Sequence, residues 1–126
     1  MRSRIIVTGA SGGIGVKIVR KFIDEGCFVI ITDLDPERMS FKARENGLNE
    51  DSYRICALDI TKEESVRETL ARLYGEHGRF DALVNAAGIC GHYSKTIDYS
   101  FENFRKIYEV NVFGTFLMMK YVLPYM

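Results

Sequence analysis

The chain has 126 residues, and its 17 lysines and arginines balance its 17 aspartates and glutamates. A chain of this length fits one domain with its own hydrophobic core, so we expect a single domain over residues 1–126. The balanced charge provides no broad positive field, which argues against a nucleic acid or an anionic membrane as a partner.

Four short apolar runs predict buried strands: Arg4 to Thr8, Cys27 to Thr32, Tyr53 to Leu58 and Ala82 to Asn85. Apolar residues follow one another in these runs without alternation, which is typical of strands covered on both faces. The first run begins so close to Met1 that we expect no signal peptide before it, and therefore a cytosolic protein.

Helical periodicity separates the strands. The first helix is expected to bury one face, made of Ile14, Ile18, Val19, Phe22 and Ile23. The second connection, Pro36 to Gly47, has the proline and glycine placement of a short helix.

The third helix is expected to bury Val66, Leu70, Leu73 and Tyr74. Thr61 and Glu64 have the spacing of a capping box at its start. Gly75 and Gly78 are predicted to mark its end.

The segment from Phe101 to Met126 is predicted to be one long helix, apolar on several faces. A membrane span is a poor interpretation because Gly114, Lys120 and Pro124 interrupt its most apolar part. We expect this helix to lie between the sheet and a protein partner.

Strands that alternate with helices predict a parallel sheet with right-handed crossovers. The expected fold is a Rossmann-like, doubly wound α/β sheet of strand order 3-2-1-4, which opens a ligand crevice between strands one and four. Small residues at the end of the fourth strand, Asn85-Ala86-Ala87-Gly88, would leave room for a cofactor there.

Cysteines and histidines predict no metal site. Cys27, Cys56 and Cys90 are odd in number and lie far apart near apolar segments, which suits reduced, mostly buried thiols. His77 and His92 do not have metal-ligand spacing and are interpreted as surface or helix-end residues.

A glycine-rich run joins the first strand to the first helix: Thr8-Gly9-Ala10-Ser11-Gly12-Gly13-Ile14-Gly15. Gly9 suits a tight turn, Gly13 lets a phosphate approach the backbone, and Gly15 lets the helix lie close to the strand. The amides at the helix start and the positive end of the helix dipole predict a pyrophosphate site.

Asp33 ends the second strand about 20 residues beyond this loop, as dinucleotide binding requires. Its carboxylate can accept hydrogen bonds from the adenosine ribose and would repel a 2′-phosphate, which favours NAD over NADP. Gly12 supplies no cation for such a phosphate, and Leu34 is a further candidate for the cofactor site. The alternative interpretation of Asp33 is a plain turn residue that opens the loop to Pro36.

These residues resemble the short-chain dehydrogenase/reductase family. The loop from Thr8 to Gly15 is similar to the coenzyme loop of the family, and Asp33 matches its NAD-selecting acid. The resemblance implies that Asp59 and Ile60 line the adenine pocket, and Asn85-Ala86-Ala87-Gly88 is similar to the family's Asn-Asn-Ala-Gly run. It also implies that Asn111, within Asn111-Val112-Phe113-Gly114, helps to hold a water in a proton relay.

The same resemblance implies a further strand with a serine and a helix with Tyr-x-x-x-Lys. No tyrosine of this chain has a lysine four residues later. Because a tyrosine needs a neighbouring cation to act as a proton donor near neutral pH, we expect a truncated chain that is catalytically incompetent alone.

Two hypotheses remain open. The chain is a portion of an NAD-dependent oxidoreductase that acts on an unidentified alcohol or carbonyl compound, or it is a non-catalytic NAD-binding module for regulation or assembly. In either case the exposed edge of the fourth strand and the helix from Phe101 to Met126 predict a homo-oligomer. Tyr93 and Ser94 are interpreted as solvated loop residues that could instead line a substrate mouth.

Overall fold

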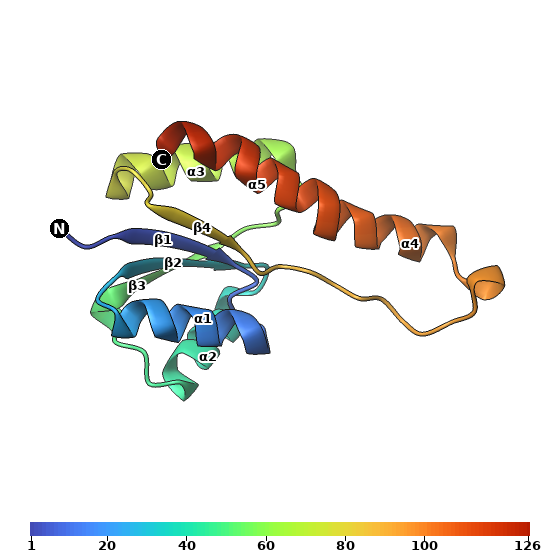
Figure 1. Cartoon of the computed structure of the whole chain (residues 1–126), viewed down its shortest axis with the longest axis horizontal. Helices are drawn as coiled ribbons and strands as arrows, with labels where there is room; N and C mark the ends of the chain where they lie inside the picture. The colour runs from blue at the N-terminus through green and yellow to red at the C-terminus, as the bar shows by residue number, and fades with distance from the viewer.

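The computed structural model describes all 126 residues and places a four-stranded parallel sheet at the centre of the molecule (Figure 1). The strands are β1 (Arg4–Thr8), β2 (Phe28–Asp33), β3 (Tyr53–Ala57) and β4 (Ala82–Asn85). Their order is β3-β2-β1-β4, and every neighbouring pair is parallel. The predicted Rossmann-like topology is confirmed, with strand ends that differ by one residue in β2 and β3.

Helices cover both faces of the sheet. On one face lie α1 (Gly13–Asp24) and α2 (Pro36–Glu45), and on the other lie α3 (Glu63–His77) and the helix that follows β4 (Figure 1). Each face has its own cluster of buried apolar side chains. This double cover explains why the strands are apolar without alternation.

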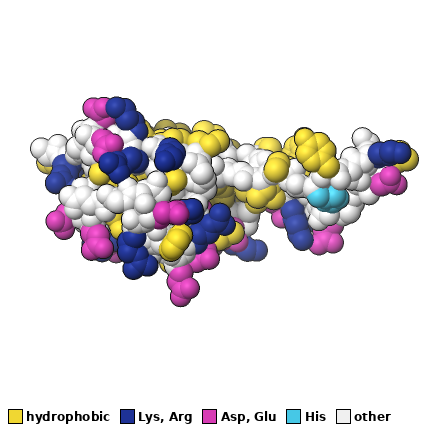
Figure 2. Space-filling model, turned by 90° about the horizontal axis from the view of Figure 1, so that it is seen from below, with side chains coloured by type: hydrophobic (Ala, Val, Ile, Leu, Met, Phe, Trp, Pro, Cys, Tyr) yellow, Lys and Arg dark blue, Asp and Glu magenta, His cyan; other side chains and the backbone are white.

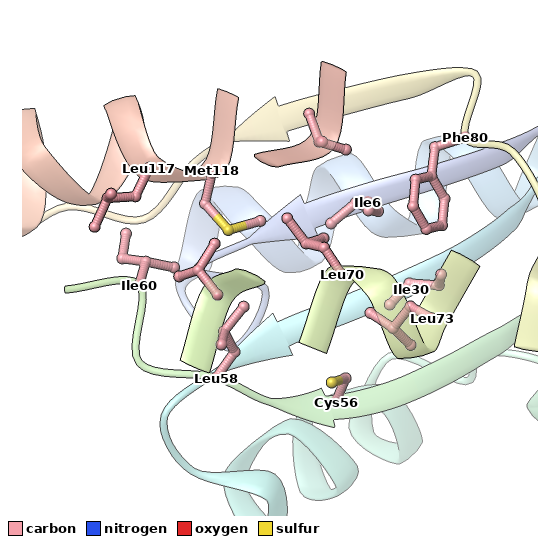
Figure 3. Close-up of a cluster of buried hydrophobic side chains, with 12 residues drawn as sticks. Ile6, Ile30, Cys56, Leu58, Ile60, Leu70, Leu73, Phe80, Leu117 and Met118 are labelled. Carbon is pink, nitrogen blue, oxygen red and sulfur yellow. The ribbon is translucent and has the colours of Figure 1, made fainter. Parts of the chain in front are cut away.

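The larger cluster fills the space between the sheet and α3 (Figure 3). Ile6 and Ile30 of the sheet, Leu70 of α3 and Met118 of the last helix are each fully buried in it. Phe80 closes the cluster, and its amide donates to the carbonyl of Tyr125 over 2.9 Å. This bond fixes the end of the last helix beside the start of β4.

The start of α3 differs from the prediction. The expected capping box is wrong, because Lys62 is the N-cap residue and provides no side-chain hydrogen bond. Thr61 instead donates from its amide and its hydroxyl to Oδ1 of Asp59, over 3.0 and 2.7 Å. Asp59 closes a tight turn after β3. The Thr61 hydroxyl is therefore bonded to Asp59 and does not cap α3.

The end of α3 is set by Gly78, whose φ of +79° places it in the left-handed region. Gly75, which was also predicted to mark this end, lies inside the helix. Glycine tolerates a positive φ at no steric cost, so only the second glycine terminates α3.

The predicted long helix after residue 100 is continuous but not uniform. It comprises α4 (Phe101–Tyr108), a π-helical segment (Glu109–Gly114), α5 (Thr115–Val122) and a 3₁₀ turn (Leu123–Tyr125). None of the helices in the structure is long and apolar enough to cross a membrane.

Gly114 ends the π-helical segment at a close packing contact. A Cβ at this position would come within 2.6 Å of the side chain of Ile60. The glycine therefore lets the last helix approach the turn that follows β3.

Three burial predictions are wrong. Tyr74 of α3 is 43% exposed and stacks on Tyr125 instead of lying in the core. Ile14 is 76% exposed, because it lies in the first turn of α1 beside the glycine loop and not beneath the strands. Among the three free cysteines only Cys56 is buried, while Cys27 is partly buried and Cys90 is exposed in the segment after β4. That segment leaves the sheet as an extended arm before α4 begins, so it offers little surface for burial (Figure 1).

Candidate functional site

A cleft of about 340 Å³ opens at the carboxyl ends of β1, β2 and β4. The position agrees with the crevice predicted from the strand order. Ten of the residues predicted for a cofactor site line it: Gly9, Ser11, Gly12, Asp33, Leu34, Asp59, Ile60, Ala86, Ala87 and Gly88. The structure therefore brings together segments that are far apart in the sequence.

The other predicted cofactor-binding residues adjoin lining residues in the sequence but do not line the cleft themselves. Gly13, Ile14 and Gly15 form the first turn of α1, and Asn85 ends β4. A Cβ on Gly13 would meet no atom within 4 Å, so its backbone borders open space.

Gly9 makes the closest contact between the two sides of the cleft. Its φ is +63°, and a Cβ there would come within 2.7 Å of the backbone of Ala87. Beside it, the hydroxyl of Thr8 accepts from the amide of Ala87 over 3.1 Å. The backbones of the glycine loop and of the residues after β4 thus lie against each other, and the Thr8 side chain links them.

The start of α1 is uncapped. Gly12 is the N-cap residue, and the first turn contains no acidic side chain. Gly12 donates its amide to the carbonyl of Gly9 over 3.1 Å, which closes the loop. The first amides of any helix lack a carbonyl partner one turn earlier, so this helix start can offer hydrogen-bond donors to a ligand.

Gly15 shapes the same loop from behind. A Cβ there would come within 2.2 Å of the carbonyl oxygen of Gly9, which no side chain tolerates. The predicted requirement for glycine at this position is therefore real, but the close partner is the loop itself and not the strand.

The carboxylate of Asp33 lies at the edge of the cleft and is held by the glycine loop. Its Oδ2 accepts from the amide of Ser11 over 3.2 Å and from the Ser11 hydroxyl. Its Oδ1 accepts from the amide of Leu34 over 2.8 Å. A carboxylate has about four acceptor sites, so one remains for a ligand.

Asp35, two residues after Asp33, is the residue that caps α2. Its Oδ1 accepts from the amides of Glu37 and Arg38 over 3.0 and 3.1 Å. Asp33 therefore does not cap α2, and its side chain turns to the glycine loop and the cleft. This arrangement favours the site interpretation of Asp33 over that of a plain turn residue.

Sequence reasoning missed Arg38. It lines the cleft from the first turn of α2 and forms no ion pair with any carboxylate. The other charged residues of the lining are Asp33 and Asp59. The capping pattern at Asp35 was the available signal, because it places Arg38 three residues into a helix that starts beside Asp33.

Asn111 lies in the π-helical segment beside the cleft. Its Oδ1 accepts from the amide of Ile89 over 2.8 Å, and its Nδ2 donates to the carbonyl of Ile89 over 2.7 Å. The side chain thus holds the segment after β4 against the last helix. Single turns of π-helix often occur where a side chain must be placed for function.

The chain is similar to known proteins over nearly its whole length. The family model described as short chain dehydrogenase matches residues 3–126. An uncharacterized oxidoreductase of Bacillus subtilis, YxjF, is 38% identical over 129 residues, which cover 100% of this chain and 49% of the relative. The L-fucose dehydrogenase of Bos taurus is 36% identical over 122 residues, which cover 97% of this chain and 44% of the relative.

A solved structure, ElxO with NADP bound, has the same architecture. It is 30% identical in sequence, the TM-score is 0.93, and the match covers 100% of this chain and 51% of the other. The chain thus spans about half the length of the relatives that it matches. Because the family model covers nearly every residue, the chain belongs to the short-chain dehydrogenase family.

Proposed function

We propose that this chain forms the coenzyme-binding part of an oxidoreductase that transfers a hydride between NAD and an alcohol or carbonyl compound. The observation that carries the proposal is the pairing, in one cleft, of an uncapped helix start with a carboxylate oriented by the glycine loop. The relatives named as a dehydrogenase and an oxidoreductase support the class of reaction.

The start of α1 would bind the pyrophosphate. Its amides and the positive end of its dipole attract an anion, and the first turn carries no acid that would repel one. Gly12 and Gly13 present backbone without side chains on the approach. In this position a diphosphate would accept hydrogen bonds from the first amides of α1, which no side chain of the chain caps.

The adenosine half would lie over the ends of β2 and β3. Asp33, which already accepts three hydrogen bonds, keeps one acceptor site for the ribose hydroxyls. Leu34, Leu58 and Ile60 provide apolar lining nearby, which suits an adenine ring. Asp59 lies between Leu58 and Ile60 and stabilises the turn there by accepting a hydrogen bond from the amide of Thr61.

We propose NAD and not NADP because the negative charge of Asp33 faces the ribose position. Two observations argue for NADP, namely the cation of Arg38 in the same cleft and the NADP bound to the similar structure ElxO. Asp33 outweighs them because it is fixed by three donors, whereas no hydrogen bond or ion pair fixes the Arg38 guanidinium. The balance between these two side chains is directly testable.

When bound, the nicotinamide supplies or accepts the hydride. The residues of the cleft would bind and orient the coenzyme, and Asn111 holds the backbone of Ile89, which lines the same cleft. Hydride transfer to a carbonyl forms an alkoxide, which needs a proton donor. No tyrosine within residues 1–126 has a lysine four residues later to support that role. We propose that this 126-residue polypeptide binds NAD without turning over a substrate.

The second candidate function is a non-catalytic NAD-binding module that acts through assembly. An exposed apolar surface on the last helix favours it, made of Phe101, Phe104, Tyr108, Phe113 and Phe116. Hydrophobic side chains also gather along the projecting arm (Figure 2). The edge of β4 is unpaired as well, so both features would support a homo-oligomer.

Substitution of Asp33 tests the choice of coenzyme. We expect Asp33→Asn to weaken NAD binding about tenfold or more, since hydrogen bonds to a charged group contribute about 1.5–3 kcal/mol. The same change should strengthen NADP binding, and Arg38→Gln added to it should remove that gain. Isothermal titration calorimetry with both coenzymes measures these effects. Equal NAD affinity for the Asp33→Asn variant and the unsubstituted chain would contradict the proposal.

Two glycine substitutions separate binding from folding. We expect Gly13→Ala to leave the melting temperature of the free chain unchanged or raised, because its Cβ meets open space in a helical turn, but to weaken NAD binding severalfold. Gly15→Ala should lower the melting temperature, because its Cβ overlaps the Gly9 carbonyl. Thermal melts with and without NAD check both variants. Normal NAD affinity in Gly13→Ala would place the pyrophosphate elsewhere.

Turnover of the polypeptide is expected to be absent. The purified 126-residue chain, mixed with NADH and a panel of carbonyl compounds, should show no loss of absorbance at the nicotinamide band above the rate without protein. NAD binding measured on the same sample serves as the control for folding. Steady oxidation of NADH with any carbonyl compound would show that another group donates the proton.

Self-association is expected to depend on the last helix. Phe116 is 57% exposed on α5, and Phe116→Glu should shift the chain from a dimer or larger species toward the monomer at micromolar concentration. Leu34→Glu, which changes an exposed apolar residue of the cleft, is the matched control. Sedimentation velocity measures both, and a monomeric unsubstituted chain would refute the proposal.

A further inference from the structure

A second pocket lies at the opposite end of the sheet from the cleft. It has a volume of about 270 Å³ and is lined by Arg2, Arg4, Phe28, Glu76 and His77. These residues come from the N-terminal segment, the starts of β1 and β2, and the last turn of α3. The N-terminus and the end of α3 lie together at this end of the molecule (Figure 1).

The strand register places cations on the face that α3 covers. Arg4 pairs with Phe28, and Ile30 pairs with Arg54. Because side chains alternate along a strand, Arg4, Phe28 and Arg54 share the face of the buried Ile6 and Ile30. The cations therefore border the end of α3 and the pocket beside it.

Acidic side chains offset the positive charge at this end only in part, and one of them, Asp81, accepts from the backbone amide of Arg4 over 2.8 Å. Arg2, Arg4 and Arg54 form no ion pair with a carboxylate. Glu76, the one acid of the lining, is already bound by Arg72 over 2.9 Å. The guanidinium of Arg2 donates only to the backbone carbonyl of Asp51, and that of Arg4 only to the sulfur of Met1.

His77 leaves a buried polar atom beside the same pocket. Its Nε2 has no hydrogen-bond partner, and the nearest carboxylate oxygen, Oε2 of Glu76, is 3.6 Å away. Burial lowers the pKa of His77, Glu76 opposes this, and Arg54, Arg4 and Arg72 lower it further. Burial and the nearby guanidinium groups thus favour the neutral form of the imidazole.

A simpler role for the arginines is to complement the negative end of the α3 dipole. That end is equivalent to about half an elementary charge, which is smaller than the charge of one arginine. The dipole can account for one of these cations but not for Arg2, Arg4 and Arg54 together. A bound anion would find unpaired guanidinium groups at this end.

We propose that this pocket binds a phosphate group, with the guanidinium groups of Arg2 and Arg4 as its donors and the Phe28 ring as its apolar wall. Guanidinium groups match the geometry of phosphate oxygens and bind them with paired hydrogen bonds. The volume suits a single phosphate or the phosphate end of a small metabolite. The site is separate from the coenzyme cleft, at the amino ends of the strands.

NMR of the two histidines tests the proposal. His77 lines the pocket, whereas His92 stacks on Tyr99 in the projecting arm and reports on nonspecific effects. Inorganic phosphate, added to the 126-residue chain at constant ionic strength, should shift the His77 ring signals along a saturable curve and leave those of His92 in place. A parallel titration with AMP identifies the source, because tighter binding of AMP at His77 assigns a nucleotide and equal binding assigns a plain phosphate.

Charge-removing variants make the test specific. Arg4→Gln should weaken phosphate binding about tenfold, since it removes charge-assisted hydrogen bonds. Arg67→Gln on the exposed side of α3, where Arg67 already pairs with Glu64, is the matched control and should bind phosphate normally. Should Arg4→Gln fail to fold, Arg2→Gln in the N-terminal segment provides the same comparison. Parallel, non-saturating shifts of both histidines, or unchanged affinity in the arginine variant, would overturn the proposal.

Discussion

The backbone of Gly9 lies so close to that of Ala87 that a Cβ on Gly9 would come within 2.7 Å of the amide nitrogen and the Cα of Ala87. Only glycine fits at this point, and its φ of +63° is also one that other residues rarely adopt. This contact joins the exit of β1 to the exit of β4. The cleft opens beside it because the following residues, Ala86 to Gly88, are too small to fill the space.

The last helix secures the other side of the same contact. Gly114 lets that helix approach Ile60, and Asn111 holds both backbone groups of Ile89 just after Gly88. The π-helical segment carries both residues. The chain after β4 is therefore fixed between the glycine loop and the last helix, although the arm beyond it extends away from the body (Figure 1).

Apolar runs were enough to predict all four strands, because burial on both faces leaves a clear pattern. The alternation of strands with helices then predicted the strand order and the place of the cleft. Details set by competing polar contacts were not predictable in this way. Thr61 bonds to Asp59 and not to its helix, and the π-helical turn at Asn111 depends on a partner 22 residues away. Arg38 was missed because its exposed position in α2 gives no periodic signal, although the capping pattern at Asp35 places it in the first turn of a helix that starts beside Asp33.

The two ends of this sheet differ in charge for a reason that follows from its parallel topology. All strands point one way, so helix starts gather at their carboxyl ends and helix ends at their amino ends. At the carboxyl ends, the uncapped α1 attracts an anion while Asp33 and Asp59 remain close by, so a ligand there must combine negative charge with hydroxyl donors. At the amino ends the end of α3 favours cations, but Arg2, Arg4 and Arg54 exceed what one dipole can balance. A dinucleotide satisfies the first condition, and a small phosphate satisfies the second.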